Sequence, residues 1–265
     1  RYGLGAIKGT GESAIENVIA ARASGGAFGG LFDFCRRVDR RIVNRRAIES
    51  LIRAGAFDSI EPRRSALLAT VGAAMEHAER TSLAVNQQSL FDADEDQAAE
   101  MPLVAMAPWD DKRRLKEEKS ALGFYLSGHP FDAYRDEIRR FIKTPLSAVT
   151  ALAGNWEAGQ ATQLFAGVIE SLRSQNSQNG RMMIVYVSDG AAKLELTVYT
   201  DVLDRFRRLL VEDQLIVVEA KVRQHRRGAS GEDGETTVTR VVAEQIFDLD
   251  QARSRFARML RIRLN

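Results

Sequence analysis

Residues 7–15 have the sequence Ile7-Lys8-Gly9-Thr10-Gly11-Glu12-Ser13-Ala14-Ile15, in a chain of 265 residues. Two glycines one residue apart stand before a segment, residues 14–23, whose apolar side chains recur at three- and four-residue spacing. This spacing predicts a helix, and the glycines predict a tight turn that opens it. Because glycine has no Cβ atom, backbone N–H groups in such a turn can approach an anion closely, and the positive end of the helix dipole favours that anion.

No strand is predicted before this turn, which argues against a dinucleotide-binding fold. The pattern resembles the hairpin of a helix-hairpin-helix motif, which holds the DNA phosphate backbone without reading the base sequence. A plain tight turn is the alternative that the two glycines leave open. The predicted DNA-binding residues of this hairpin are Lys8, Gly9, Thr10 and Gly11.

An arginine cluster stands directly before a second predicted helix, residues 44–54. Residues 36–46 contain six arginines and a single acidic residue. Asn44 is a suitable N-cap, but Arg45 and Arg46 would stand in the first helical turn, where positive charge opposes the helix dipole. A bound phosphate would offset this placement, and a solvated arginine-rich face is the alternative. The predicted DNA-binding residues here are Arg41, Arg45 and Arg46.

A polar, acidic tract follows an alanine-rich segment, residues 64–80, that has high helix propensity. Residues 81–108 consist largely of Asn, Gln, Ala and acidic residues with two prolines, and residues 81–111 carry a formal charge of −7. The blocks on either side, residues 1–80 and 112–150, each carry +4. We therefore expect residues 81–108 to form an extended, largely unpacked linker.

Two large apolar residues, Leu90 and Phe91, stand side by side in this linker. No core is expected there to receive them, so we expect them to enter a pocket of a partner protein. A Gln ahead of a Leu-Phe pair resembles the short peptide by which bacterial replication proteins bind the hydrophobic cleft of the ring-shaped sliding clamp. The predicted clamp-binding residues are Gln87, Gln88, Ser89, Leu90 and Phe91.

Two further helices are predicted before the next change of pattern. Asp110 or Asp111 can cap the first, residues 112–122, and the second covers residues 133–142. Residues 109–150 are therefore predicted to be a helical segment.

Beyond residue 160 the pattern changes from helical to strand-like. Five β-rich runs, separated by Asn, Gly and Ser turns, cover residues 163–172, 181–188, 194–199, 215–222 and 236–247. A helix capped by Asp201 is predicted at residues 201–210, between the third and fourth runs. Five strands with a helix in this position follow the order of an OB-fold, a small closed barrel that binds oligonucleotides. A five-stranded barrel without a ligand is the alternative. We therefore predict a multidomain, α plus all-β chain.

The predicted barrel, residues 160–248, offers cationic edges to single-stranded DNA. Loops are predicted at residues 173–181 and 223–227, and both carry arginines. Tyr186 can offer a flat ring for base stacking, and packing against a barrel neighbour is the alternative. The predicted DNA-binding residues of the barrel are Arg173, Arg181, Tyr186, Arg223, Arg226 and Arg227.

Several kinds of chemistry are not supported by the composition. Cys35 is the single cysteine, so no intramolecular disulfide or cysteine-based metal site can form, and three scattered histidines do not supply a metal site either. No apolar run approaches the roughly 20 residues of a membrane span, and the N-terminus lacks a signal-peptide pattern. We therefore expect a soluble, cytoplasmic protein without a membrane partner and without a metal or other cofactor.

Five longer stretches resemble one protein family. They are Tyr2-Gly3-Leu4-Gly5-Ala6-Ile7-Lys8-Gly9, Leu31-Phe32-Asp33-Phe34-Cys35, Val43-Asn44-Arg45-Arg46, Leu51-Ile52-Arg53-Ala54-Gly55-Ala56-Phe57-Asp58 and Leu122-Gly123-Phe124-Tyr125-Leu126-Ser127-Gly128-His129-Pro130. With the motifs above, they resemble the C-terminal region of the bacterial replicative DNA polymerase III alpha subunit. The resemblance runs over nearly the whole chain.

The resemblance implies a DNA-binding and clamp-binding processivity module for DNA replication. In that family the region follows the fingers domain and contains the helix-hairpin-helix element, here residues 1–80, then the clamp peptide and the OB domain. Residues 249–265 would lead into a further domain, missing here, that binds a subunit of the clamp loader. The expected partners are double- and single-stranded DNA, the sliding clamp (beta subunit) and, through the missing domain, the clamp loader.

The resemblance also implies that the parent protein is a DNA-directed DNA polymerase, a nucleotidyltransferase that uses Mg²⁺. Its palm, whose carboxylates hold two metal ions, lies upstream in the family, so this fragment is expected to be inactive alone. Two alternatives remain: a fragment of a nuclease or ligase-type DNA enzyme, and the error-prone paralogue of the same polymerase.

Overall fold

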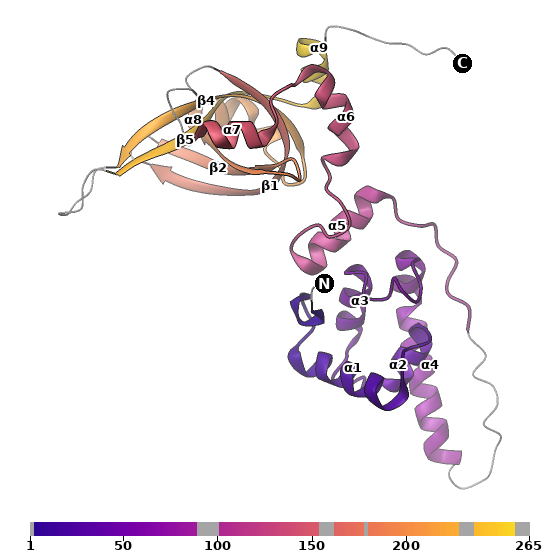
Figure 1. Cartoon of the computed structure of the whole chain (residues 1–265). Coiled ribbons are helices and arrows are strands. Elements are labelled where there is room, and N and C mark those ends of the chain that lie inside the picture. The colour runs from indigo at the N-terminus through magenta and orange to yellow at the C-terminus, as the bar shows by residue number, and fades with distance from the viewer. Residues whose placement is uncertain (1–2, 89–100, 154–161, 178–179, 228–235, 258–265) are drawn as a thin grey trace, which may run out of the picture. The chain divides into compact units, whose positions relative to one another are not determined.

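The computed structural model describes residues 3–88, 101–153, 162–177, 180–227 and 236–257 (Figure 1). The chain divides into two compact units, Arg1–Ser127 and Gly128–Asn265. This division falls inside the predicted helical segment, residues 109–150, whose first helix belongs to the first unit and whose second helix belongs to the second unit.

The first unit consists of helices. After a 3-10 helix, Leu4–Ala6, they are α1 (Glu12–Gly25), α2 (Leu31–Arg37), α3 (Arg45–Arg53), α4 (Arg64–Gln88) and α5 (Asp111–Leu122). The helices predicted at residues 14–23, 44–54 and 112–122 are confirmed. Asn44 caps α3 by accepting a hydrogen bond from the Ala47 backbone at 3.0 Å, and Ile48 and Ile52 on its inner face are fully buried. The predicted cap and apolar face of α3 are thus confirmed.

Helix α2 was not predicted, and it packs against α4. The ring of Phe32 in α2 lies 5.8 Å from that of His77 in α4, edge to face. Cys35 on the inner side of α2 is 1% exposed, and burial raises the pKa of its thiol to about 12.

Helix α4 continues to Gln88, eight residues beyond the helix predicted at residues 64–80. Residues 101–108 have no regular secondary structure and are exposed except for Leu103, but two contacts hold them to the helices of the first unit. The backbone N–H of Val104 donates to Thr70 Oγ1 at 2.9 Å, and Leu103 contacts the core. The expected unpacked linker therefore differs from the structure at both ends, because Leu and Ala residues sustain the helix at one end and Leu103 finds the core at the other.

A buried ion pair joins α4 to α5. Glu118 is fully buried and accepts hydrogen bonds from Arg64 Nη1 at 2.9 Å and from the backbone N–H groups of Leu126 and Ser127 at 3.0 and 2.9 Å. Burial by itself raises the pKa of Glu118, but these hydrogen bonds outweigh it and hold the pKa below its ordinary value. This pair could not be predicted from the sequence, because its members are 54 residues apart.

One glycine makes room for this ion pair. Gly55 has a φ of +81°, and a Cβ atom there would collide with the guanidinium group of Arg64. Arg64 also donates to Asp58 Oδ1 at 2.8 Å, so its side chain cannot move aside without breaking charged hydrogen bonds. Glycine is therefore required at position 55 for both conformational and steric reasons.

The second unit is built around a five-stranded closed barrel. Its strands are β1 (Gln163–Ser177), β2 (Gly180–Ser188), β3 (Lys193–Tyr199), β4 (Leu215–Arg227) and β5 (Thr236–Phe247), in the spatial order β1-β2-β3-β5-β4. Strands β3 and β5 pair in parallel, and the other neighbours are antiparallel. With α8 (Thr200–Phe206) between β3 and β4, this order is that of an OB-fold, and the predicted fold is confirmed.

Three helices complete the second unit: α6 (Asp132–Phe141), α7 (Leu146–Ala153) and α9 (Leu249–Phe256). Helix α6 confirms the prediction at residues 133–142. Helix α7 lies against the barrel in Figure 1 and buries Leu146 and Val149 in its core. Helix α9, capped by Asp248, packs Phe256 against Phe247 with ring centroids 5.4 Å apart. Residues 249–256, expected as a lead-in to another domain, thus contribute to this unit.

Two predicted loops and one predicted cap of the barrel are corrected by the structure. Residues 173–177 and 180–181 belong to strands β1 and β2, and residues 223–227 belong to β4. Helix α8 begins at Thr200, and its N-cap residue is Tyr199, so Asp201 is not the cap. The Thr200 hydroxyl instead donates to the Arg181 carbonyl at 2.5 Å. These tertiary contacts override the local turn and capping signals.

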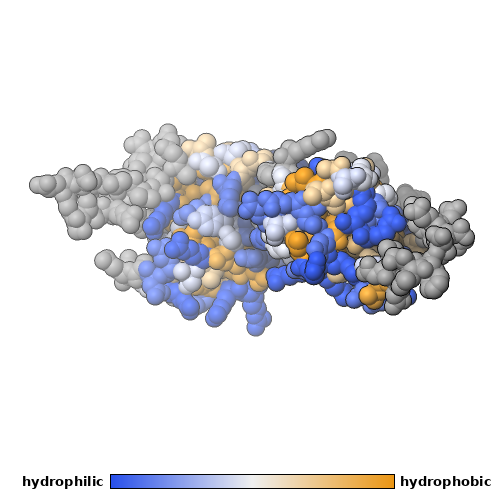
Figure 2. All heavy atoms as spheres, turned by 90° about the horizontal axis from the view of Figure 1, so that it is seen from below, coloured by the Kyte–Doolittle hydropathy of each residue, from blue (hydrophilic) through white to orange (hydrophobic). Residues whose placement is uncertain are grey.

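One face of the molecule is mostly hydrophilic where its residues are described. In Figure 2, polar side chains cover much of the visible face, with smaller hydrophobic patches between them. Across the described ranges, every helix is too short or too polar to cross a membrane.

Candidate nucleic-acid interface

The predicted hairpin is a tight turn stabilised by a hydrogen bond within the turn. Gly9 has a φ of +85°, and the Thr10 hydroxyl donates to the Ile7 carbonyl oxygen at 2.7 Å. Gly11 is the N-cap residue of α1 and supplies no side-chain cap. The Thr10 side chain is therefore used inside the turn, whereas the first backbone N–H groups of α1 are left for another acceptor.

Helix α3 brings the arginine cluster to this hairpin. A Cβ atom on Gly9 would lie 3.5 Å from Ser50 Oγ and 3.8 Å from Arg46 Nε. Arg46 is exposed and forms no ion pair with a described residue. Two segments that are separate in the sequence thus place backbone donors and an unneutralised cation side by side, a pairing suited to a phosphate group.

Arg45 differs from Arg46, although the sequence treats them alike. Arg45 Nε lies 2.8 Å from Glu49 Oε1, one helical turn further along α3. This ion pair offsets the unfavourable position of Arg45 in the first turn without any phosphate. Arg45 therefore needs no anionic ligand at this position, and for Arg46 the expected phosphate contact stays a prediction.

The other predicted cations of the first unit, Lys8 and Arg41, differ in their surroundings. Lys8 Nζ lies at the C-terminal end of α5, where a Cβ atom on Gly123 would be 3.2 Å away, and the helix dipole favours a cation there. Arg41 is 89% exposed and donates two hydrogen bonds to Asp39, which lower the pKa of that carboxyl group. Both side chains are exposed, but Arg41 would have to leave Asp39 to reach a phosphate.

Tyr186 on the barrel also has partners. Its hydroxyl donates to Glu195 Oε2 at 3.1 Å, and Lys193 Nζ lies 5.0 Å from its ring centroid. Lys193 in turn pairs with Glu170 at 2.6 Å. A base that stacks on Tyr186 would have to displace Lys193, so the predicted stacking role has a competitor within the protein.

The predicted arginines of the barrel lie in two β-hairpins. Arg173 and Arg181 are exposed near the tip of the β1–β2 hairpin. Arg223, Arg226 and Arg227 lie in the β4–β5 hairpin, opposite Arg240, Thr237 and Thr236, and their side chains lie outside the described part of the structure. The barrel therefore presents its predicted cations on extended ribbons and not on loops.

The predicted clamp peptide is described only in part. Gln87 and Gln88 are the last residues of α4, and their side chains are not described. Ser89, Leu90 and Phe91 lie outside the described residues.

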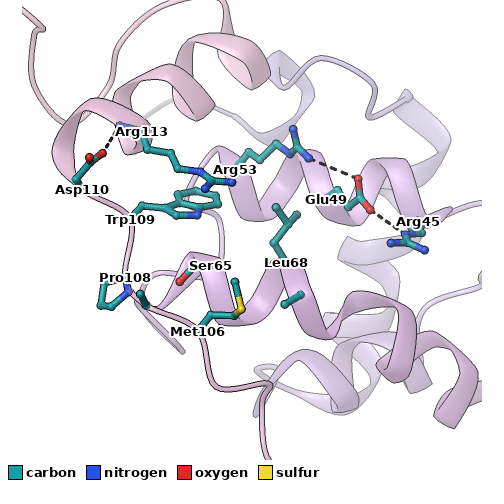
Figure 3. A pocket seen from close by; sticks show the side chains of 12 residues that line it. Arg45, Glu49, Arg53, Ser65, Leu68, Met106, Pro108, Trp109, Asp110 and Arg113 are labelled. Atoms are coloured by element: carbon teal, nitrogen blue, oxygen red, sulfur yellow. Dashed lines mark hydrogen bonds and ion pairs between the residues drawn. The ribbon is translucent and has the colours of Figure 1, made fainter.

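A cavity that was not predicted from the sequence lies in the first unit; it is open to solvent and is lined by residues of α3, α4 and the segment 106–113 (Figure 3). Arg45, Glu49 and Arg53 on one face of α3 recur every four residues, a spacing that could have indicated a shared surface. Ser65 and Trp109 carry no such signal. Over the described ranges, no group of three or more His, Cys, Asp or Glu residues could hold a metal ion.

The hairpin before α1 assigns the first unit to the helix-hairpin-helix class. The five-stranded barrel assigns the second unit to the OB-fold class. Residues 1–67 match the family model described as the helix-hairpin-helix motif. The OB-fold assignment rests on the strand order and register given above.

From end to end, the chain resembles DNA polymerase III subunit alpha. It is 40% identical to that subunit of Neisseria meningitidis serogroup B over 264 residues, which are 100% of this chain and 22% of the relative. Against the subunit of Escherichia coli strain K12 the identity is 35% over 269 residues, which are 99% of this chain and 22% of the relative. The chain is homologous to the C-terminal region of these alpha subunits and spans about a fifth of their length.

The similarities to solved structures are low and cover about a third of the chain. The mitochondrial single-stranded DNA-binding protein Rim1 of S. cerevisiae matches with 18% identity and a TM-score of 0.25, over 34% of this chain and 92% of that chain. A small single-stranded DNA-binding protein from Streptomyces coelicolor matches with 14% identity and a TM-score of 0.26, over 34% of this chain and 94% of that chain.

Proposed function

We propose that this chain is a processivity module of a replicative DNA polymerase, which binds duplex DNA through phosphates, contacts single-stranded DNA with its barrel and binds the sliding clamp. The observation that carries the proposal is the meeting of the Gly9–Gly11 turn and Arg46, in a chain that resembles DNA polymerase III alpha subunits along its full length. Nucleotidyl transfer, with its Mg²⁺ ions, is proposed to belong to another part of the parent protein.

Duplex binding follows from the chemistry of the hairpin. A phosphate beside Gly9 would accept hydrogen bonds from backbone N–H groups at the start of α1 and a charged hydrogen bond from Arg46. None of these groups distinguishes one base from another, so the affinity should fall steeply with salt and vary little with sequence.

The test is a comparison of two arginine variants of the full chain. Arg46→Ala should weaken duplex binding about tenfold and reduce the slope of log affinity against log salt by roughly one, because one charged phosphate contact is lost. Arg22→Ala, at the other end of α1, removes the same charge from an exposed position and should change neither quantity beyond a small general effect. If both variants bind duplex DNA like the parent chain, the hairpin is not the duplex site.

Clamp binding is proposed for residues 87–91. The peptide pattern and the homology to the alpha subunits support it. Leu90 and Phe91 would fill apolar pockets of the clamp, while the Gln87 amide would hydrogen-bond at the edge of the cleft.

A further inference from the structure

Helix α5, labelled in Figure 1, carries lysines on the side that faces away from the core of the first unit. Its buried residues are Leu115, Glu118 and Ala121, which define its inner face. Because successive residues of a helix are turned by about 100°, positions 112, 116 and 119 lie on the opposite face. All three positions are lysines. The outward face of α5 therefore presents a row of positive charge.

Lys8 of the hairpin extends this row at the end of the helix. Its backbone N–H donates to the Ala121 carbonyl oxygen at 2.8 Å, so the hairpin is attached to the last turn of α5. Its Nζ would lie 3.2 Å from a Cβ atom on Gly123, which follows Lys119 by one helical turn. Lys119 Nζ lies 5.4 Å from the ring centroid of Tyr125. The lysines thus follow one another from the start of α5 to the hairpin.

The arginines of α5 have acidic partners, whereas its exposed lysines do not. Arg113 and Arg114 each pair with an acidic residue of the same helix, at 3.8 and 3.0 Å. Lys112 and Lys116 are exposed and form no ion pair with any residue of the described ranges. They stand four residues apart, where like charges repel, and Lys112 lies in the first turn, where positive charge opposes the helix dipole. An anion outside the unit would offset both effects.

The row leads to the candidate phosphate site of the hairpin, since Gly9 follows Lys8 and Arg46 lies beside Gly9. From Lys112 to Gly123, α5 rises by about 16 Å. A strand of duplex DNA carries one phosphate per about 3.4 Å of its axis, so a row of this length can meet several phosphates in succession. An acidic protein segment would carry the same sign of charge, but protein interfaces have an apolar centre, which this face of α5 lacks.

We propose that the lysine row, defined as Lys8, Lys112, Lys116 and Lys119, binds phosphates of the duplex that the hairpin holds. The proposal rests on the duplex-binding function proposed above and extends that site from the hairpin along α5. Lysine ammonium groups act as point charges and do not distinguish base pairs at the phosphate backbone. The row therefore lengthens the contact without adding sequence preference.

The first experiment compares two double variants of the full chain that remove the same charge. Lys112→Gln with Lys116→Gln should weaken binding of a blunt-ended duplex about tenfold at low salt. It should also reduce the slope of log affinity against log salt by roughly two, because two phosphate contacts are lost. Gln and Lys have similar helix propensities, so the melting temperature should not fall. The control, Arg22→Gln with Arg80→Gln, removes two exposed arginines elsewhere in the first unit and should change the slope little.

Amine acetylation of the parent chain, read residue by residue by mass spectrometry, locates the contact. Bound duplex should slow the acetylation of Lys112 and Lys116 several-fold, whereas Lys143, an exposed lysine of the second unit, should keep its rate. Protection that spares Lys112 and Lys116 overturns the proposal. A row that is already unreactive without DNA also overturns it, because an acidic protein segment would then cover these lysines.

Arg46→Ala distinguishes failure of this proposal from failure of the proposed duplex function. If Arg46→Ala weakens duplex binding while the lysine double variant binds like its control, the lysine row alone is overturned. If only the lysine double variant weakens binding, the row stands and the hairpin assignment falls. If neither changes the affinity, or if the parent chain binds no duplex, both proposals fall.

Discussion

Arg64 and Arg46 in the first unit have different roles, one structural and one available to a ligand. Arg64 is buried and held by Asp58, Glu118 and the Arg53 carbonyl group, whereas Arg46 is exposed and left without a described partner. A buried charge is tolerated only when its hydrogen bonds are complete, while an exposed one remains available to a ligand. The sequence predicted Arg46 from its position at a helix start but gave no sign of Arg64, because its partner Glu118 belongs to a distant helix.

Glu118→Gln tests the buried pair. Removing one partner of such a pair leaves an uncompensated charge, so the first unit should lose about 3 kcal/mol or more of unfolding free energy at neutral pH. The pKa of Glu118 is held below its ordinary value, so its carboxylate contributes stability at neutral pH, and this contribution is lost as the pH falls through the folded-state pKa. The difference between variant and parent should therefore be largest near pH 7 and shrink below about pH 4. Urea unfolding at several pH values measures it.

The matched control for this prediction is Glu117→Gln, one residue away. Glu117 pairs with Arg53 at 3.2 Å and with Arg113 at 3.8 Å near the surface, so its loss should cost about 1 kcal/mol or less. A Glu118→Gln variant as stable as this control would show that the buried pair is not needed for the fold.

At the scale of helices and strands, the features that could be predicted from the sequence are those that depend on neighbouring residues only. The Asn44 cap was predicted, and Asp110 was one of two candidates for the cap of α5, because a cap needs only a side chain and a nearby backbone N–H group. Helix α2 was missed because its seven residues are too few to show a clear period. The arginine-bearing ends of β1 and β4 were predicted as loops because they extend beyond the barrel core and so lack an apolar face. The cavity beside Trp109 is made by three segments and could not be predicted.

The β1–β2 hairpin is expected to provide the barrel's contact with single-stranded DNA. Among the predicted barrel residues whose side chains are described, Tyr186 is occupied by Lys193 and Glu195, which leaves the exposed Arg173 and Arg181. Binding should be micromolar or weaker. Arg173→Ala with Arg181→Ala should weaken it several-fold, whereas Arg208→Ala, an exposed arginine after α8, should not. Chemical-shift mapping with a short oligonucleotide measures this, and perturbations confined to other surfaces of the barrel would contradict it.

At the scale of the whole molecule, each unit contains its own core and its own proposed DNA contact. The sequence predicted a helical part followed by an OB-fold, and the structure agrees because each fold is determined by contacts within its own unit. The sequence divided the chain by composition, however, while the structure places α5 with the first unit through the Arg64–Glu118 pair.

The proposed clamp peptide, residues 87–91, would join the whole chain to another protein. Leu90→Ala with Phe91→Ala should weaken clamp binding by roughly a hundredfold or more, because burying two such side chains is worth about 1.5–3 kcal/mol each. The melting temperature should not change, and Leu83→Ala, a 57% exposed leucine of α4, should leave clamp affinity intact. A large drop in melting temperature, or unchanged clamp binding, would place the pair in this protein's own interior.

Because Cys35 is buried, the rate at which a thiol reagent labels it reports how often the first unit opens. Thiol reagents attack the thiolate, and with a pKa of about 12 the folded protein offers almost none at pH 8. Modification must therefore wait until the core around Cys35 opens, and the labelling rate relative to that in urea gives the free energy of this opening. Labelling as fast as in urea would contradict the packing of α2. Duplex DNA that binds the closed unit should slow the reaction in proportion to its occupancy. The native thiol can therefore report both local opening and ligand binding without an engineered cysteine.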